Sequence, residues 1–211
     1  MLVAQHGSDH VTTANPLADQ GTTKPVDPCV KFDIVERPPI QQIVDRYPAR
    51  FHAHHQRWLA AKLGLDAVND TDGAFIQSFH ELLATEGLDL TLAFRWLAEL
   101  ANDSLDHTPL PEIFTAPPAL LNWVEDWQSR RKANKGDPST ITATMRSVNP
   151  TIIPRNHLVQ KAIDLTESGE LAWVRSLVDR NQRPFEWQPG DVEWARSPEP
   201  EERVTRTFCG T

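Results

Sequence analysis

The chain has 211 residues, and its formal net charge is −8 because 29 Asp and Glu outnumber 21 Lys and Arg. This balance argues against a general nucleic-acid-binding protein, since neutralising phosphates takes an excess of basic side chains. No apolar run approaches the ~20 residues of a membrane-spanning helix, and the N-terminus lacks the apolar stretch of a secretory signal. We therefore expect a soluble protein that binds neither membrane nor nucleic acid, located in the cytoplasm or, in a eukaryote, in mitochondria.

Residues 1–39 are polar and have neither a helical nor a strand period, so we expect a disordered region or linker there. From Ile40 to Leu63, apolar side chains recur at four-residue spacing, which predicts helix up to a terminating Gly64. Because proline removes a backbone donor, Pro48 is expected to end one helix and to begin a second.

Further helices are predicted between the Gly and Pro residues of the middle of the chain. They cover residues 75–86, 90–100 (capped by Asp89), 120–132, 138–145 (capped by Asp137, with Pro138 at its first position), 154–168 and 171–178. A Pro-rich link precedes the third of them, and sustained strand alternation is missing. The predicted fold class is all-α, with a helical region over 40–181 and an extended tail over 182–211.

Sequence motifs of common active sites are missing from the chain. It contains no G-x-x-x-x-G-K-[ST] or G-x-G-x-x-G loop, no H-R-D or D-F-G kinase motif, and no C-x-x-C, H-E-x-x-H or G-x-S-x-G. The sequence therefore predicts no catalytic, cofactor-binding or metal-binding residue of its own.

Three looser clusters have a structural and a functional interpretation, and we favour the structural one for each. They are His52, His54 and His55; Asp66, Asp70 and Asp72; and the basic run 130–135. Two imidazoles on one helix face lack further metal ligands, and the acidic loop lacks the spacing of a calcium site. The basic run is typical of a solvated helix C-terminus, with phosphate contact as the alternative.

Residues 145–158 form the most distinctive segment of the sequence, M-R-S-V-N-P-T-I-I-P-R-N-H-L. Asn149-Pro150 marks a turn, Arg155-Asn156 opens the next helix, and Arg146 stands on the other side of the turn. A guanidinium can bind several carbonyls or a carboxylate at once. We favour a polar junction between two helices over the alternative, an interface that positions a neighbouring lobe.

This segment resembles the C-terminal region of the selenoprotein O family, also called SelO or YdiU. The resemblance covers roughly Ile40 to Thr211 and includes Y-P-A-R-F at 47–51, A-K-L-G-L at 61–65, L-A-F-R-W-L at 92–97 and R-P-F at 183–185. Its structural motif residues are Arg146, Asn149, Pro150, Arg155, Asn156, Arg183 and Pro184. Thr151 and Pro154 depart from the usual pattern, so the turn is expected to differ locally.

The resemblance implies a helical C-terminal portion of a protein-kinase-like fold, in a pseudokinase that transfers AMP from ATP to hydroxyl groups of protein substrates with Mg²⁺. The family's catalytic residues lie upstream of this region, so none can be carried over. The chain alone is expected to bind no cofactor and to be inactive, with a separately encoded kinase-like N-terminal part as a candidate partner. The alternatives are a stand-alone helical interaction module and a non-functional remnant.

Cys209 lies where family members carry a Cys or a selenocysteine, so the resemblance implies a candidate redox residue. Arg203 and Arg206 favour its thiolate, whereas the neighbouring Glu201 and Glu202 oppose it. Its redox partner stays open, because two cysteines do not define a disulfide framework.

Overall fold

The computed structural model describes residues 37–69 and 72–205, and within these residues it contains helices and no strand, which confirms the all-α prediction. The chain divides into two units, Met1–Ala49 and Arg50–Thr211, and the first is described only by the start of helix α1. The predicted disorder of residues 1–39 falls almost wholly outside the described residues. None of the described helices is both long and apolar enough to cross a membrane.

Helix α1 (Arg37–Leu63) begins three residues before the predicted start and contains Pro48 in its interior. Its first turn holds Pro38 and Pro39, where a missing N–H breaks no helical bond. The prediction of a helix break at Pro48 is wrong. A proline removes one bond of the ladder, yet this 27-residue helix is continuous through Pro48.

The helices of the second unit follow their local sequence signals closely. After α2 (Asp72–Glu86), the Asp89 carboxylate caps α3 (Leu90–Leu100) by accepting the N–H of Leu92 at 2.9 Å. Helix α5 (Pro118–Arg131) is followed by α6 (Pro138–Val148), where Asp137 accepts the N–H of Thr140 at 2.9 Å. Both predicted aspartate caps are confirmed.

Two segments predicted as link and extended tail contain short helices, which corrects both predictions. The Pro-rich link includes η2 (Leu105–His107) and α4 (Leu110–Ile113). The tail follows α7 (Asn156–Glu167) and α8 (Ala172–Asn181) and contains α9 (Val192–Ala195) and η3 (Pro200–Glu202). The tail folds back onto α8 because its Trp194 is buried and stacks on Trp173, with ring centroids 4.6 Å apart.

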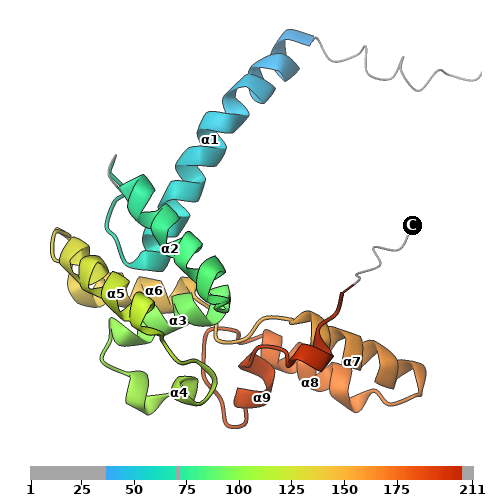
Figure 1. Cartoon of the computed structure of the whole chain (residues 1–211). Coiled ribbons are helices and arrows are strands. Elements are labelled where there is room, and N and C mark those ends of the chain that lie inside the picture. Colours follow the sequence, from blue (N-terminus) through green and yellow to red (C-terminus); the bar gives the residue numbers. More distant parts are fainter. Residues whose placement is uncertain (1–36, 70–71, 206–211) are drawn as a thin grey trace, which may run out of the picture. The chain divides into compact units, whose positions relative to one another are not determined.

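The second unit has two apolar cores. The larger is centred on α3, whose residues 92–99 are all buried, and it includes side chains of α1, α2, α5 and α6. The smaller lies among α7, α8 and α9, which are grouped together in Figure 1. Ile113 and Trp187 pack against both cores, so these two side chains connect the cores.

Candidate functional site

The side chain of Arg95 is fully buried on α3, the central helix of the larger core. It forms an ion pair with the carboxylate of Glu99, one turn along the same helix and also fully buried. A buried guanidinium is costly unless its remaining N–H groups find acceptors. The surroundings of Arg95 therefore decide whether this pair stabilises the fold.

Backbone carbonyls from distant segments supply acceptors for Nη1, whereas Nε is buried without a hydrogen-bond partner among the described residues. The Nη1 atom of Arg95 donates to the carbonyl oxygens of Asn149 and Phe185, each at 3.0 Å, and to that of Arg146 at 3.3 Å. Carbonyls at a helix C-terminus have no partner within the helix, so Arg95 satisfies part of the end of α6. One side chain thus joins α3 to the end of α6 and to the segment after α8.

Asn149 joins the same turn to α1. Its side chain accepts a hydrogen bond from the Lys62 ammonium at 3.0 Å and donates to the Lys62 carbonyl at 2.9 Å. The ammonium also donates to the Val148 carbonyl at 3.0 Å and lies 4.5 Å from the centroid of the Trp58 ring. Burial lowers the pKa of Lys62 to about 8, because an apolar environment disfavours the charged form.

The carbonyl of Pro184 is the second anchor of the turn. It accepts the N–H of Thr151 at 2.7 Å, the Thr151 hydroxyl at 3.0 Å and the N–H of Ile152 at 3.3 Å. Thr151 is fully buried, and its hydroxyl is satisfied by this bond. Thr151, one of the two residues expected to depart from the family pattern, therefore adds a bond to the junction.

Arg155, which follows the turn, forms an ion pair with Asp89. Two hydrogen bonds of 2.5 and 3.3 Å join the guanidinium to the carboxylate, which also accepts the Ser197 hydroxyl at 3.0 Å. Burial by itself would raise the pKa of Asp89, but the bonds from Arg155, Leu92 and Ser197 outweigh it and leave that pKa below its ordinary value. We call the side chains of Lys62, Asp89, Arg95, Glu99, Asn149, Thr151 and Arg155, with the Pro184 carbonyl, the polar junction.

The motif residues named from the sequence divide into two groups. Asn149, Arg155 and Pro184 belong to the polar junction, and Pro150 is half-buried beside them. The Arg146 side chain lies at its edge, 43% exposed and 3.6 Å from Glu99.

Two motif residues lie away from the junction. Asn156 and Arg183 are exposed, and their side chains form no hydrogen bond or ion pair within the described part of the chain. The candidate redox residue Cys209 and its possible partner Cys29 are outside the described residues.

The sequence reading missed Arg95, Glu99 and Lys62 as members of the junction. A usable signal was present, because Arg95 and Glu99 are four residues apart within an otherwise apolar helix. Charged side chains among consecutive core positions must pair, so such a pattern predicts a buried ion pair.

The acidic loop and the basic run, interpreted separately from the sequence, contact each other. The Asp72 carboxylate accepts two hydrogen bonds from Arg130, at 2.7 and 2.9 Å, and Asp66 accepts the N–H of Lys135 at 2.7 Å. The interpretation of Arg130 as a solvated helix end is corrected, because its side chain is only 18% exposed. Asp70 lies outside the described residues.

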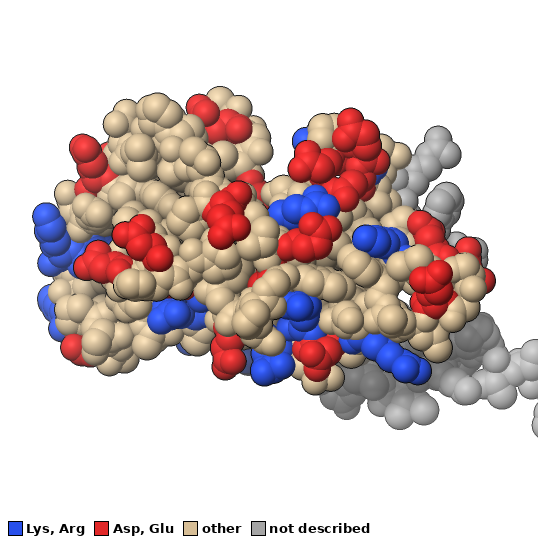
Figure 2. Space-filling model, turned by 90° about the horizontal axis from the view of Figure 1, so that it is seen from below, with Lys and Arg blue, Asp and Glu red and all other residues tan. Residues whose placement is uncertain are grey.

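The histidine cluster on α1 is exposed, with Nδ1 of His54 3.2 Å from Arg57. In residues 37–69 and 72–205, no three His, Cys, Asp or Glu side chains are arranged to hold a metal ion. On the face shown in Figure 2, basic and acidic side chains are interspersed among uncharged residues.

Fold and site together define an all-helical region whose helices are joined by a buried polar junction, in which residues of one sequence motif contact buried charges of α1 and α3. Comparison with known families identifies it: the model of the family described as protein adenylyltransferase SelO matches residues 28–182. The chain belongs to this family, which confirms the resemblance.

Curated relatives agree with this assignment. The protein nucleotidyltransferase YdiU of Rhizobium meliloti is 39% identical over 166 residues, covering 78% of this chain and 34% of the relative. Those of Rhizobium etli (35% identity) and Rhodopseudomonas palustris (36%) match 80% and 81% of this chain. The matched region is 34% of the R. etli and 35% of the R. palustris protein, so this chain spans about a third of the length of these relatives.

Proposed function

We propose that this chain forms the C-terminal helical part of a SelO-type protein adenylyltransferase, in which AMP is transferred from ATP to hydroxyl groups of proteins. The proposal rests on one observation. The family model covers residues 28–182, and the motif within that range contributes Asn149 and Arg155 to the polar junction. The names of the family and of the relatives give the reaction class, transfer of a nucleotidyl group to protein.

In this proposal the chain has a supporting role, and the residues that bind ATP and Mg²⁺ belong to the part of the family protein outside the matched third. Phosphoryl and nucleotidyl transfer depend on positioned cations, metal ions and carboxylates. The charged side chains of the polar junction are paired mainly with internal partners, although Nε of Arg95 and Nε of Arg155 are buried without a hydrogen bond among the described residues. They are therefore suited to fixing geometry.

The proposal is tested by measuring transfer of labelled AMP to protein in the presence of Mg²⁺. We expect no transfer by the chain alone, and transfer when it replaces the matched region of the Rhizobium meliloti relative. The Arg183→Ala variant of the replaced protein is the control and should keep the transfer activity. Arg183 is exposed and belongs to the motif without joining the polar junction. Transfer by the isolated chain would contradict the supporting role, and a folded but inactive replacement would favour a separate interaction module.

A further inference from the structure

A cavity of about 400 Å³ lies where the end of α3, the end of α5 and the start of α6 meet. These three helices belong to the second unit and lie together in Figure 1. The volume of the cavity is within the range of sites that bind small molecules. Its lining contains no member of the polar junction, so the cavity has no role in what has been described above.

The basic run at the end of α5 divides at this cavity. Arg130 is paired with Asp72, whereas Arg131 and Lys132 line the cavity, and neither of these two forms an ion pair within the described part of the chain. A helix C-terminus favours nearby cations, which accounts for the exposed Lys132. The same preference does not explain why the Arg131 side chain is half-buried.

Most hydrogen-bond donors of Arg131 are unused. Its Nη2 atom makes one long bond of 3.4 Å to the Thr142 hydroxyl, Nε is buried without a partner, and Nη1 has no partner among the described residues. The guanidinium carbon lies 4.8 Å from the centroid of the Trp127 ring, so the aromatic face holds the cation beside the cavity. Burial lowers the pKa of Arg131, because no described carboxylate compensates for the lost hydration. A half-buried cation in this state gains free energy when an anion pairs with it.

The remaining wall of the cavity is largely apolar. Leu100 and Ile141 are half-buried along it. Among the residues that line it, Asp103 is the one acid against the two bases Arg131 and Lys132, which leaves a single positive charge. One carboxylate balances this charge, whereas a phosphate dianion exceeds it.

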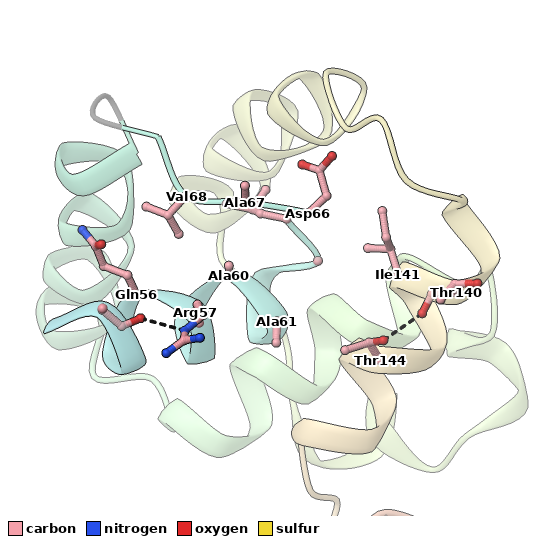
Figure 3. Close-up of a pocket in the computed structure, with 13 residues that line it drawn as sticks. Gln56, Arg57, Ala60, Ala61, Asp66, Ala67, Val68, Thr140, Ile141 and Thr144 are labelled. Carbon is pink, nitrogen blue, oxygen red and sulfur yellow. Dashed lines mark hydrogen bonds between the residues drawn. The ribbon is translucent and has the colours of Figure 1, made fainter. Parts of the chain in front are cut away.

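A second, larger groove of about 790 Å³ provides a comparison, because Ile141 lines it as well (Figure 3). Both Arg57 and Asp66 line this groove, so its charges balance each other. Arg57 is exposed and donates to the Ala53 carbonyl of its own helix at 3.2 Å. The half-buried guanidinium without a counter-ion therefore distinguishes the smaller cavity from the larger groove.

We propose that the cavity at the end of α5 binds a small organic acid, whose carboxylate pairs with Arg131 and whose apolar body lies against Leu100 and Ile141. A guanidinium binds a carboxylate through two parallel N–H groups, and Nη1 and Nη2 of Arg131 are available for this. Binding sites for small molecules combine such an anchor with apolar walls. The inference goes beyond the proposed function, since the ligand contacts no residue of the polar junction.

An NMR chemical-shift titration of the full chain with benzoate tests the site, and uncharged benzamide is the comparison ligand. We expect one saturable site for benzoate with a Kd of about 1 mM or lower, and much weaker binding of benzamide. Arg131→Met keeps the apolar stem and should weaken benzoate binding about tenfold or more, because hydrogen bonds to charged groups are strong. Arg57→Met, in the larger groove, is the matched control and should bind benzoate like the wild type.

Failure of benzoate to saturate, or equal affinity for benzamide, would overturn the proposal. A loss in Arg57→Met as large as that in Arg131→Met would also overturn it, because the ligand would then lie in the larger groove. Phenyl phosphate replaces benzoate in a further titration, and tighter binding of phenyl phosphate would refute the choice of a carboxylate.

Two milder variants keep the test decisive if the melting curve of Arg131→Met shows that it does not fold. Arg131→Lys keeps the charge but loses the parallel N–H groups, and Lys132→Met removes the exposed second cation. Each should weaken benzoate binding by a few fold, and unchanged affinity in both would contradict the site. None of these measurements involves a nucleotide, so the site can be refuted while nucleotidyl transfer is found, and the reverse.

Discussion

Asp89 and Arg155 are 66 residues apart in sequence, and one carboxylate serves both the start of α3 and the approach to α7. The Asp89 side chain caps α3 through the N–H of Leu92 and holds the Arg155 guanidinium at 2.5 Å. The Asp89 carboxylate therefore caps its own helix and also connects the two cores through Arg155.

Asp89→Asn should separate these two roles, since asparagine caps helices as well as aspartate does. The variant keeps the cap but leaves the Arg155 side chain, only 7% exposed, without its counter-charge. We expect a loss of about 3 kcal/mol in the free energy of unfolding, measured by denaturant titration. Asp89→Ala should lose about 1 kcal/mol more, and equal losses would show that the cap contributes nothing.

The ion pair between Asp89 and Arg155 should make the free energy of unfolding depend on pH. The folded-state pKa of Asp89 is below its ordinary 3.8, so its contribution is complete above that value and is lost as pH falls through the folded-state pKa. The stability difference between the wild type and Asp89→Asn should therefore shrink in acid. A difference that stays constant from pH 6 down to the acid transition would contradict the ion pair.

Arg95→Met should be among the most damaging single substitutions in the chain. It leaves the buried Glu99 carboxylate with only the partly exposed Arg146, 3.6 Å away, as a cation and removes the donor to three carbonyls, at a cost of about 3–5 kcal/mol. Adding Glu99→Leu should recover part of this loss, because no unpaired charge then remains buried. Arg183→Ala, at an exposed site, should change stability by less than about 0.5 kcal/mol.

Lys62 should give an alkaline pH dependence. Its pKa is about 8 in the folded state against 10.5 ordinarily, so the unfolded state holds more protons between these values. The free energy of unfolding should rise with pH in that window, by no more than about 3 kcal/mol. The comparison with Lys62→Met isolates this effect, and parallel curves for the two proteins would contradict it.

Gly64 and Gly87 form a matched pair, since each follows a helix with a positive φ, 66° and 65°. Alanine at either site should lower the free energy of unfolding by about 1 kcal/mol, because a side chain disfavours the left-handed conformation. At Gly64 the added methyl also overlaps Sδ of Met145, whereas nothing lies within 4 Å of it at Gly87. Gly64→Ala should therefore lower the melting temperature clearly more than Gly87→Ala, and equal shifts would refute the packing argument.

The sequence by itself determined most of the longer helices and the family, but neither the continuity of α1 through Pro48 nor the short helices of the link and the tail. The caps at Asp89 and Asp137 and the glycine after α1 act within one helical turn, so they can be read locally. The motif around Asn149 indicated the family that the comparison then showed.

Only the tertiary structure decided the partners within the junction and the course of the tail. The acceptors of Arg95 are 51 to 90 residues away, and Arg130 finds Asp72 across 58 residues. The tail folds back because Trp194 is buried against Trp173, 21 positions earlier in the printed sequence. Helix capping and hydrophobic periodicity depend on interactions between residues that are close in sequence. The pairing of a buried charge depends instead on which distant segments the cores bring together.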